Sequence, residues 1–350
     1  MIKLTEHLAQ NIVDKMMEVI PYNVNIMNAE GVIIGSGDKS RIGQLHQGAV
    51  KAIREEKLIA VHEIAGGAKP GVNVPIYFNN EIMGVIGISG DPGVVEAFAS
   101  IVKVTAELLI NQEYAFNERR TRERIKEEFL YQWAYSKDYD ENFLHMAEAV
   151  HIDLSINRTA VIINNGEKNI VDKLRKYLYP EEYAVRINLE RVLIFMKVDS
   201  KLNKRITTLC EGLDNITKVG VGIKQEIMSK SVQQAIKAVE ITEKLGIKKR
   251  ICNYRELAFI DSIVKTIKKD SFYSLVEKLN EESKGLDLVD TLITYIMLNG
   301  EVNSTAAELH IHRNSLNYRL KKIQEITGKN PRNLVELMEL FIACILYKLK

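Results

Sequence analysis

The sequence NSTAAELHIHRNSLNYRLKKI, residues 303–323, contains two short helical patterns joined by a tight turn. In the first pattern, Ala306 and Leu309 fall on one side of a helix. The spacing from Thr305 to Glu308 matches a capping box, in which both side chains bond to free amides at a helix start. This stretch therefore predicts a helical hairpin near the end of the chain.

The second helical pattern is amphipathic. Leu316, Leu320 and Ile323 recur at helical spacing, so we expect them to pack against the first helix. The opposite face carries residue types that contact phosphates and base edges in a major groove. The spacing fits a DNA-binding helix-turn-helix over 302–326 and the polar outer face of an ordinary helical hairpin equally well. The candidate DNA contacts are Ser304, Thr305, His312, Arg313, Asn314, Ser315, Asn317, Tyr318, Arg319 and Lys321.

Length and charge limit the possible classes of protein. A chain of 350 residues is long enough for two to three domains, and 46% hydrophobic residues can form a sizeable core. The formal net charge is only +2, so affinity for DNA must come from a local basic patch. The last fifty residues have only a modest excess of Lys and Arg over Asp and Glu, which suits paired sites in a homodimer.

The sequence contains few signals for an enzyme or a membrane protein. Cys210, Cys252 and Cys344 lack metal-ligand spacing, which favours buried thiols in a reducing compartment. The seven histidines show no metal-binding motif, and phosphate-loop and nucleophile motifs are absent. No signal-peptide core and no apolar run of about 20 residues is present. We therefore expect a cytoplasmic protein that is not an enzyme and has no cofactor and no metal.

The first hundred residues alternate between hairpins and helices. The predicted strands are 24–27 with 32–34, and 71–78 with 82–88, and a helix over 46–56 separates the two hairpins. This order suits a small antiparallel sheet with helices around it, as in PAS-like or GAF-like sensor modules. Such modules hold a small ligand between the sheet and the helices.

A long helix is predicted from residue 94 onward. Residues 117–128 are almost wholly charged and contain oppositely charged pairs four residues apart, such as Glu118 with Arg122. Apolar residues bracket this segment, which favours a helix that transmits a signal or pairs with a second copy over a solvated linker. We expect ligand binding around 35–46 to act through this helix on the C-terminal part of a dimer.

The middle of the chain reads as a mixed α/β unit. Short strands and helices alternate over 158–222, including a predicted helix over 167–178, and a further helix follows over 229–245. We expect a sheet of four or five strands with helices on its faces. After residue 255 the whole pattern is helical.

Five segments together resemble one bacterial family. They are NIMNAEGVIIGSGD (25–38), RIGQLHQGA (41–49), GVNVPI (71–76), GVIGISG (84–90) and IHRNSLNYRL (311–320). They resemble the carbohydrate diacid regulators, which are transcription factors, and the resemblance covers nearly the whole chain. The last segment is shared with the helix-turn-helix of purine-catabolism regulators, where Thr is more usual at Ser315 and the hydroxyl is kept.

The resemblance implies an α+β protein with several domains. It implies a sensor domain over 1–112, linker helices over 113–150, a degenerate GGDEF-like domain over 151–258 and a helical DNA-binding domain over 259–350. The chain has no GGDEF run, so nucleotide cyclisation is not implied. The implied function is activation of genes for uptake and breakdown of sugar diacids, such as glucarate or galactarate, or of glycerate.

The candidate ligand contacts gather around Arg41. A small hydroxyacid needs a cation or backbone amides for its carboxylate, and Arg41 lies just before a helix whose first amides favour an anion. The alternative for Arg41 is a surface salt bridge with Asp38, and for His46 a packing role. For the strand residues the alternative is hydrogen bonding at turns and strand ends. The candidate set is Ser36, Asp38, Arg41, Gly43, His46, Asn73, Ser89 and Gly90.

Two other functions fit the same sequence. The DNA-binding module could serve a sensor for a purine or an amino-acid derivative. Alternatively, the middle domain could make the chain a nucleotide-binding signalling protein. The partners that we expect are DNA, a small hydroxyacid or sugar-diacid effector, and further copies of the chain in a homodimer or higher homo-oligomer, with no membrane.

Overall fold

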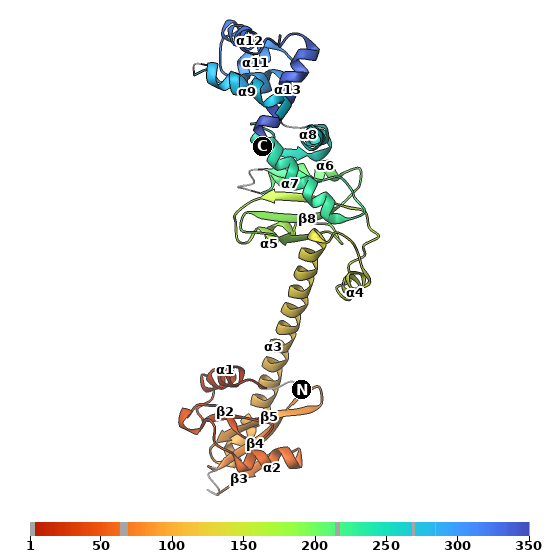
Figure 1. Cartoon of the computed structure of the whole chain (residues 1–350). Helices are drawn as coiled ribbons and strands as arrows, with labels where there is room; N and C mark the ends of the chain where they lie inside the picture. Colours follow the sequence, from red (N-terminus) through yellow and green to blue (C-terminus); the bar gives the residue numbers. More distant parts are fainter. Residues whose placement is uncertain (1–3, 64–68, 214–217, 268–269, 284, 350) are drawn as a thin grey trace. The chain divides into compact units, whose positions relative to one another are not determined.

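The computed structural model forms two compact units, Met1–Arg124 and Ile125–Lys350. Helix α3 (Pro92–Tyr135) is continuous and contributes residues to both units (Figure 1). Each unit contains one five-stranded sheet. The structure describes residues 4–63, 69–213, 218–267, 270–283 and 285–349.

The N-terminal unit has an antiparallel sheet with strand order β2-β1-β5-β4-β3. Both predicted hairpins are confirmed. The sequence did not reveal β3, which has only three residues and therefore too little alternation to recognise. The strands are β1 (Val24–Asn28), β2 (Ile33–Ser36), β3 (Ile59–Val61), β4 (Gly71–Phe78) and β5 (Glu81–Ser89).

Helices cover both faces of this sheet. Because side chains alternate along a strand, Ile26 of β1 faces one side and Met27 faces the other. Ile26 packs with helix α1 (Glu6–Met17) and the first part of α3, whereas Met27 packs under helix α2 (Gln47–Glu55). The space between α2 and the sheet is the place where the sequence predicted a ligand site.

The second unit begins with the end of α3 and a sheet of strand order β10-β9-β6-β8-β7. Strands β9 and β10 pair in parallel, and the other pairs of described strands in this sheet are antiparallel. One face packs against α7 and the end of α3, and the other packs against α5 and α6. The elements are α4 (Glu141–Ala149), β6 (Arg158–Asn164), α5 (Ile170–Leu174), β7 (Tyr183–Arg186), β8 (Arg191–Lys197), α6 (Leu202–Glu211), β9 (Val219–Val221), α7 (Met228–Lys244) and β10 (Ile251–Asn253).

The helix predicted over 167–178 is much shorter in the structure, where α5 ends at Leu174. Pro180 disfavours helical backbone in the residue before it. The Tyr177 hydroxyl donates to the Gly212 carbonyl at 2.9 Å, which holds the chain in a turn after α5. The sequence showed the apolar spacing but not this distant partner.

Helices α8 (Tyr254–Thr266), α9 (Asp270–Glu282), α10 (Leu288–Met297) and α13 (Leu334–Lys348) surround the predicted helix-turn-helix. Their hydrophobic core is continuous with α7, because Ala238 and Ile241 share one buried cluster with Leu316. The boundary expected at residue 258 falls inside α8, and the division into middle and C-terminal domains stays a prediction. Cys210, Cys252 and Cys344 are free and buried, as expected.

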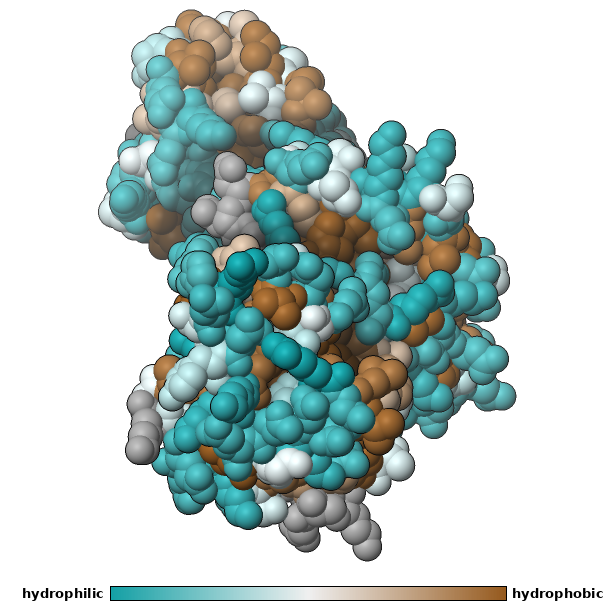
Figure 2. Space-filling view, turned by 90° about the horizontal axis from the view of Figure 1, so that it is seen from above, coloured by the Kyte–Doolittle hydropathy of each residue, from teal (hydrophilic) through white to brown (hydrophobic). Residues whose placement is uncertain are grey.

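Hydrophilic residues cover most of the face shown in Figure 2, and hydrophobic residues lie between them in small groups. Within the described ranges, no helix combines the length and the apolar character needed to cross a membrane.

Candidate functional site

The predicted helix-turn-helix is formed by α11 (Val302–Glu308) and α12 (Arg313–Thr327). The predicted capping box from Thr305 to Glu308 is wrong. Glu301 caps α11, because its carboxylate accepts a hydrogen bond from the Ser304 amide at 2.9 Å. Thr305 instead lies inside the helix and is buried.

The join between the two helices is short and well defined. His310 adopts a left-handed backbone with φ of 53°, and the Ile311 amide donates to the Ala306 carbonyl at 2.9 Å. His312 then caps α12, with its Nδ1 accepting from the Asn314 amide at 3.3 Å. Gly328, also left-handed, ends α12.

The apolar stripe of α12 is confirmed as an inner face. Leu316, Leu320 and Ile323 are buried in one cluster with Ala306 of α11. Burying this stripe fixes which residues of α12 point outward. The outward and exposed candidates on the two helices are Ser304, His312, Arg313, Asn314, Ser315, Tyr318 and Lys321.

Two of the predicted DNA contacts point into the protein. The Thr305 hydroxyl donates to the Glu301 carbonyl at 2.7 Å inside α11. Arg319 is half-buried, and its Nη1 donates to the Thr291 hydroxyl of α10 at 2.9 Å. Arg319 therefore joins α12 to α10, Thr305 bonds within the first turn of α11, and neither functional group lies on the exposed face.

Asn317 is half-buried and has a partner that the sequence did not predict. Arg332, in the exposed loop after α12, donates from Nη2 to Asn317 Oδ1 at 2.8 Å. This bond places a second guanidinium beside the outer face of α12. The two residues are fifteen positions apart, so helical spacing gave no signal of the contact.

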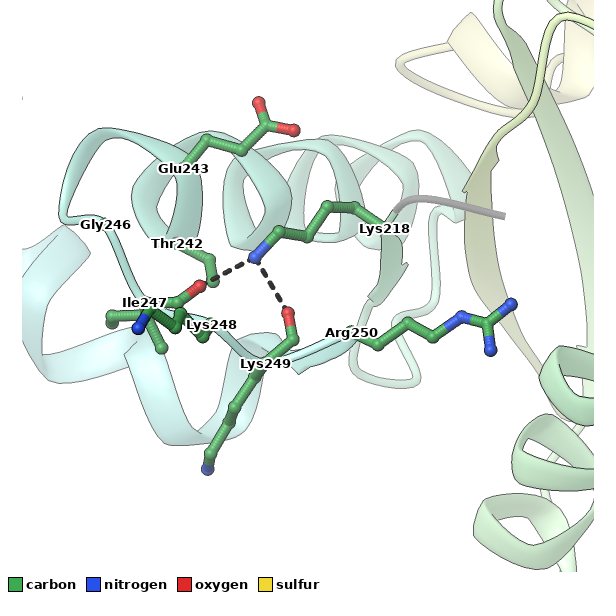
Figure 3. Close-up of a pocket in the computed structure, with 8 residues that line it drawn as sticks. All are labelled: Lys218, Thr242, Glu243, Gly246, Ile247, Lys248, Lys249 and Arg250. Carbon is green, nitrogen blue, oxygen red and sulfur yellow. Dashed lines mark hydrogen bonds between the residues drawn. The ribbon is translucent and has the colours of Figure 1, made fainter. Parts of the chain in front are cut away.

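A basic cavity of about 500 Å³ lies in the same unit, between the end of α7 and the loop before β10 (Figure 3). Lys218 reaches across it, and its Nζ donates to the carbonyls of Ile247 and Lys249 at 2.7 and 2.8 Å. These bonds fix the loop shape. Lys248 of this loop pairs with Glu308 of α11 at 2.7 Å, so the loop contacts the helix-turn-helix directly.

The candidate ligand site lies on the α2 face of the N-terminal sheet. Strand register places Ser36, Asn25, Gly87, Asn73 and Ile59 in one row across all five strands. Ser36, Asn25 and Asn73 give the row polar side chains, Gly87 has none, and the row faces α2. Asn25 and Gly87 were not among the predicted contacts, because only the register shows that Gly87 pairs with Asn73 and Asn25 pairs with Gly87.

Asn73 is the central polar group of this row. It is 3% exposed, and its Oδ1 has no hydrogen-bond partner in the described part of the chain. A Cβ atom on Gly48 of α2 would lie 2.6 Å from Asn73 Nδ2, and one on Gly87 would lie 3.0 Å from Oδ1. The two glycines therefore let α2 and the sheet enclose the amide closely.

Arg41 ends the short 3-10 helix η1 (Lys39–Arg41) and is buried, with 6% exposure. The structure shows no partner for its Nη1 among the described residues, so the surface salt bridge with Asp38 is not the arrangement found. A buried guanidinium that is not fully paired carries a desolvation cost of several kcal/mol. After burial, its charge is the second cause that lowers the pKa of His46.

His46 caps α2 and is also buried. Its Nδ1 accepts from the Ala49 amide at 3.2 Å. Burial, and then the positive charge of Arg41, hold the pKa of His46 below its ordinary value, so the ring is neutral at pH 7. With Nδ1 acting as acceptor, the proton is on Nε2, which is left as a donor.

The other candidate contacts have structural partners. The Ser36 hydroxyl donates to Asn25 Oδ1 at 2.7 Å, and Asp38 caps η1 through Ser40. The Ser40 hydrogen bonds hold the pKa of Asp38 below its usual range. Gly43 has φ of 84°, a backbone conformation that favours glycine.

Ser89 and Gly90 lie at the end of β5. Their amides donate to the carbonyls of Asn23 and Pro70, both at 2.9 Å. A Cβ atom on Gly90 would lie 2.6 Å from Val95 Cγ1, so this glycine allows close packing against α3. Arg41, His46 and Asn73 thus lie together at the α2 face, whereas Ser89 and Gly90 make structural hydrogen bonds at the end of β5.

Two families of known proteins match this chain. Residues 4–133 match the family described as putative sugar diacid recognition, and residues 288–346 match the PucR C-terminal helix-turn-helix domain. The first match contains the row under α2, and the second contains α11 and α12. Fold and matches together define a transcriptional regulator with a helix-turn-helix.

Some similar proteins match this chain over nearly their whole length. A protein of Haemophilus influenzae, described as uncharacterized, is 26% identical over 98% of this chain and 99% of that one. The carbohydrate diacid regulator of Escherichia coli is 25% identical over 97% of each chain. The proline-responsive transcriptional activator PutR of Bacillus subtilis is 30% identical over 38% of this chain and 36% of that one. These matches show a sugar-diacid-recognition domain and a PucR-type helix-turn-helix, in a chain that is similar over nearly its whole length to the carbohydrate diacid regulator of Escherichia coli.

Proposed function

We propose that the N-terminal domain binds a sugar diacid or a related hydroxyacid such as glycerate, and that binding activates genes for uptake and breakdown of that acid. The observation that carries this proposal is the buried guanidinium of Arg41, whose Nη1 is without a partner in the described chain. A carboxylate bound there would supply the missing charge and acceptor.

The groups beside Arg41 support a hydroxylated acid. Neutral His46 offers its Nε2 proton to a carboxylate or hydroxyl oxygen. Asn73 offers a buried acceptor, Oδ1, to a ligand hydroxyl. The α2 helix begins at Gln47, and the first amides of a helix favour an anion. One cation, one neutral donor and one acceptor match the groups of a hydroxyacid.

A thermal-shift panel on the full chain tests the proposal. Glucarate, galactarate and glycerate are compared with hypoxanthine and proline, which represent the purine and amino-acid alternatives. We expect at least one of the three acids to raise the melting temperature, since a ligand that binds only the folded state stabilises it. A shift with hypoxanthine or proline and none with the acids would replace the proposed effector class.

Arg41→Met is the decisive variant. It should abolish the shift with the acids and leave the unliganded protein at least as stable, because a poorly paired buried charge is replaced by an apolar side chain of similar length. Lys39→Met is the matched control, since Lys39 lies in the same short helix but is exposed. Equal shifts in the wild type and Arg41→Met would show that Arg41 does not bind the acid.

We also propose that the N-terminal domain is PAS-like and the middle one GGDEF-like. An antiparallel five-stranded sheet with helices on both faces supports the first assignment. A central sheet between two layers of helices supports the second. Neither assignment requires nucleotide turnover.

A homodimer paired through α3 is part of the proposal. Val95 and Val102 of α3 pack on the N-terminal sheet. Ile101, Val104 and Leu108 lie on the other side of the helix and are all more than half exposed. Their spacing of three and four residues is that of a coiled-coil seam, which supports pairing with α3 of a second copy.

A further inference from the structure

The seam between α7 and α8 contains a polar cavity of about 410 Å³. Helix α7 contributes Lys230, Gln234 and Lys237, which follow one another at helical spacing. Helix α8 contributes Asp261 and Lys265, one turn apart. A volume of this size is typical of small-molecule sites, although the lining here is far more polar than usual.

Asp261 is the most unusual group in this cavity. It is 2% exposed, and its Oδ2 accepts from the Tyr254 hydroxyl and from Lys265 Nζ, the latter at 2.5 Å. Its Oδ1 is buried and has no hydrogen-bond partner among the described residues. A buried carboxylate oxygen without a donor is costly, so this atom is an acceptor ready for an external donor.

Asp261 is ionised at neutral pH. Burial alone would raise its pKa, but hydrogen bonds from Lys265 and Tyr254 and the charges of Lys265 and Lys237 hold it below the ordinary value. In the same contact, burial and the bond to Asp261 raise the pKa of Tyr254 to about 12. The carboxylate can therefore only accept a hydrogen bond, and Tyr254 keeps its proton.

The rest of the lining is rich in donors. Gln234 Oε1 accepts from the Ile223 amide at 3.0 Å, which leaves its Nε2 to donate elsewhere. Lys230 and Lys237 add two ammonium groups, and Lys237 also pairs with Glu240 at 3.3 Å. A cationic ligand would meet these lysines unfavourably, whereas an anion would be attracted.

We propose that this cavity binds a small organic anion that also carries a hydroxyl group. The anionic group, a phosphate or a carboxylate, contacts Lys230 and Lys237, and the hydroxyl donates to Asp261 Oδ1. The site is separate from the Arg41 site, because all of its residues belong to the second unit. Helix α8 packs against both α7 and α13, so the ligand would join helices of one continuous core that includes α12.

Binding is measured by calorimetry on the full chain carrying Arg41→Met, which separates this site from the proposed effector site. The probes are glycerol 3-phosphate, glycerate, inorganic phosphate and glycerol. We expect glycerol 3-phosphate or glycerate to bind, phosphate to bind more weakly, and glycerol not to bind. Comparing the first two decides between phosphate and carboxylate. Absence of binding by both, or equal binding of phosphate and glycerol 3-phosphate, would overturn the proposal.

Two variants locate the binding. Lys237→Gln should weaken the bound probe about tenfold, since a hydrogen bond to a charged group is lost. Lys204→Gln, an exposed lysine of α6 outside the cavity, is the matched control and should leave affinity unchanged. Equal affinities of the two variants would place the probe elsewhere and overturn the assignment.

Asp261→Asn tests the hydroxyl contact. Lys265 and Tyr254 still require an acceptor, so the amide oxygen should take the place of Oδ2 and the NH₂ group that of Oδ1. The position that accepted the ligand hydroxyl would then be a donor. We expect the preference for glycerol 3-phosphate over phosphate to disappear. A retained preference would show that Asp261 does not recognise the hydroxyl, and Lys237→Gln still tests the site if this variant does not fold.

Discussion

Arg41 and Asn73 each keep a polar atom buried without a partner in the described chain. Such atoms lower stability, and they mark places where a ligand can repay the desolvation cost. Their residue types were enough to make them candidates from the sequence. The burial of Asn73 was not predictable, because it depends on α2 packing closely over the sheet at Gly48.

His46 gives a prediction about pH. Its pKa is lowered in the folded protein by burial and then by Arg41, against an ordinary value of 6.5. Below pH 6.5 the unfolded chain therefore binds a proton that the folded chain refuses, and stability falls as the pH falls. The loss is at most about 1.4 kcal/mol per pH unit. Melting temperatures measured from pH 7.5 to 5.5 should show it.

The matched variant for this prediction is His46→Asn. Asparagine is among the best helix N-caps and does not titrate, so α2 should still form. We expect a shallower fall of melting temperature with acid in the variant than in the wild type. Parallel curves would mean that another group causes the pH dependence.

Asn25 and Gly87 show what the sequence could not reveal about the ligand site. Each lies in a strand that was predicted correctly, and each belongs to the row that contains Asn73. The row exists only because β1 and β4 flank β5 in one register. Long-range strand order is not encoded in local alternation, so these neighbours required the structure.

At the scale of elements, α11 and α12 were predicted well in their apolar spacing and less well at their ends. Leu316, Leu320 and Ile323 are buried as expected. The helix-start signal was misplaced at Thr305, because Glu is not among the common N-cap residues and Glu301 therefore gave no signal. Arg319 was expected outside, since no local signal indicated the Thr291 hydroxyl on α10.

The outer face of α12 gives a second prediction. Tyr318→Ala should weaken binding to a selected operator about tenfold and change the free energy of unfolding by less than about 0.5 kcal/mol, because the side chain is 60% exposed. Arg319→Ala should cost about 1 kcal/mol of stability, since it removes the bond to Thr291. Gel shifts and urea unfolding measure the two effects.

One result with these two variants would contradict the prediction. If Tyr318→Ala lowers stability as much as Arg319→Ala, then Tyr318 packs in the fold and does not read DNA. The DNA contact itself should weaken as salt rises, because counterions are released from the phosphates.

At the scale of the whole molecule, α3 is the only element that contributes to both described units. The sequence predicted a long helix from residue 94 and its charged centre, because no Gly or Pro occurs from Val94 to Tyr135. Whether α3 transmits the effect of ligand binding was not predictable from the sequence pattern alone. A test should keep the helix intact and change only the rotation of its second half relative to its first.

Insertions between Arg120 and Thr121, which are both exposed, provide that test. Two added residues rotate the rest of a helix by roughly 200°, whereas seven add about two full turns. We expect the two-residue insertion to abolish the effect of the acid on DNA binding, and the seven-residue insertion to preserve it. Both proteins should keep the thermal shift with the acid. Equal coupling in both would exclude transmission through the phase of α3.

The hydrophobic core that runs from Ala238 of α7 to Leu316 of α12 limits how the helix-turn-helix can be exchanged between proteins. A DNA-binding domain that has its own hydrophobic core can be exchanged between proteins as a unit. Here Leu257 and Ile260 of α8 belong to the same core, so separating the sheet from the helix-turn-helix would expose this core to water. The helix-turn-helix and the sheet should therefore be exchanged, and should unfold, as one unit. A destabilising substitution in α7 would then weaken DNA binding although α7 does not contact DNA.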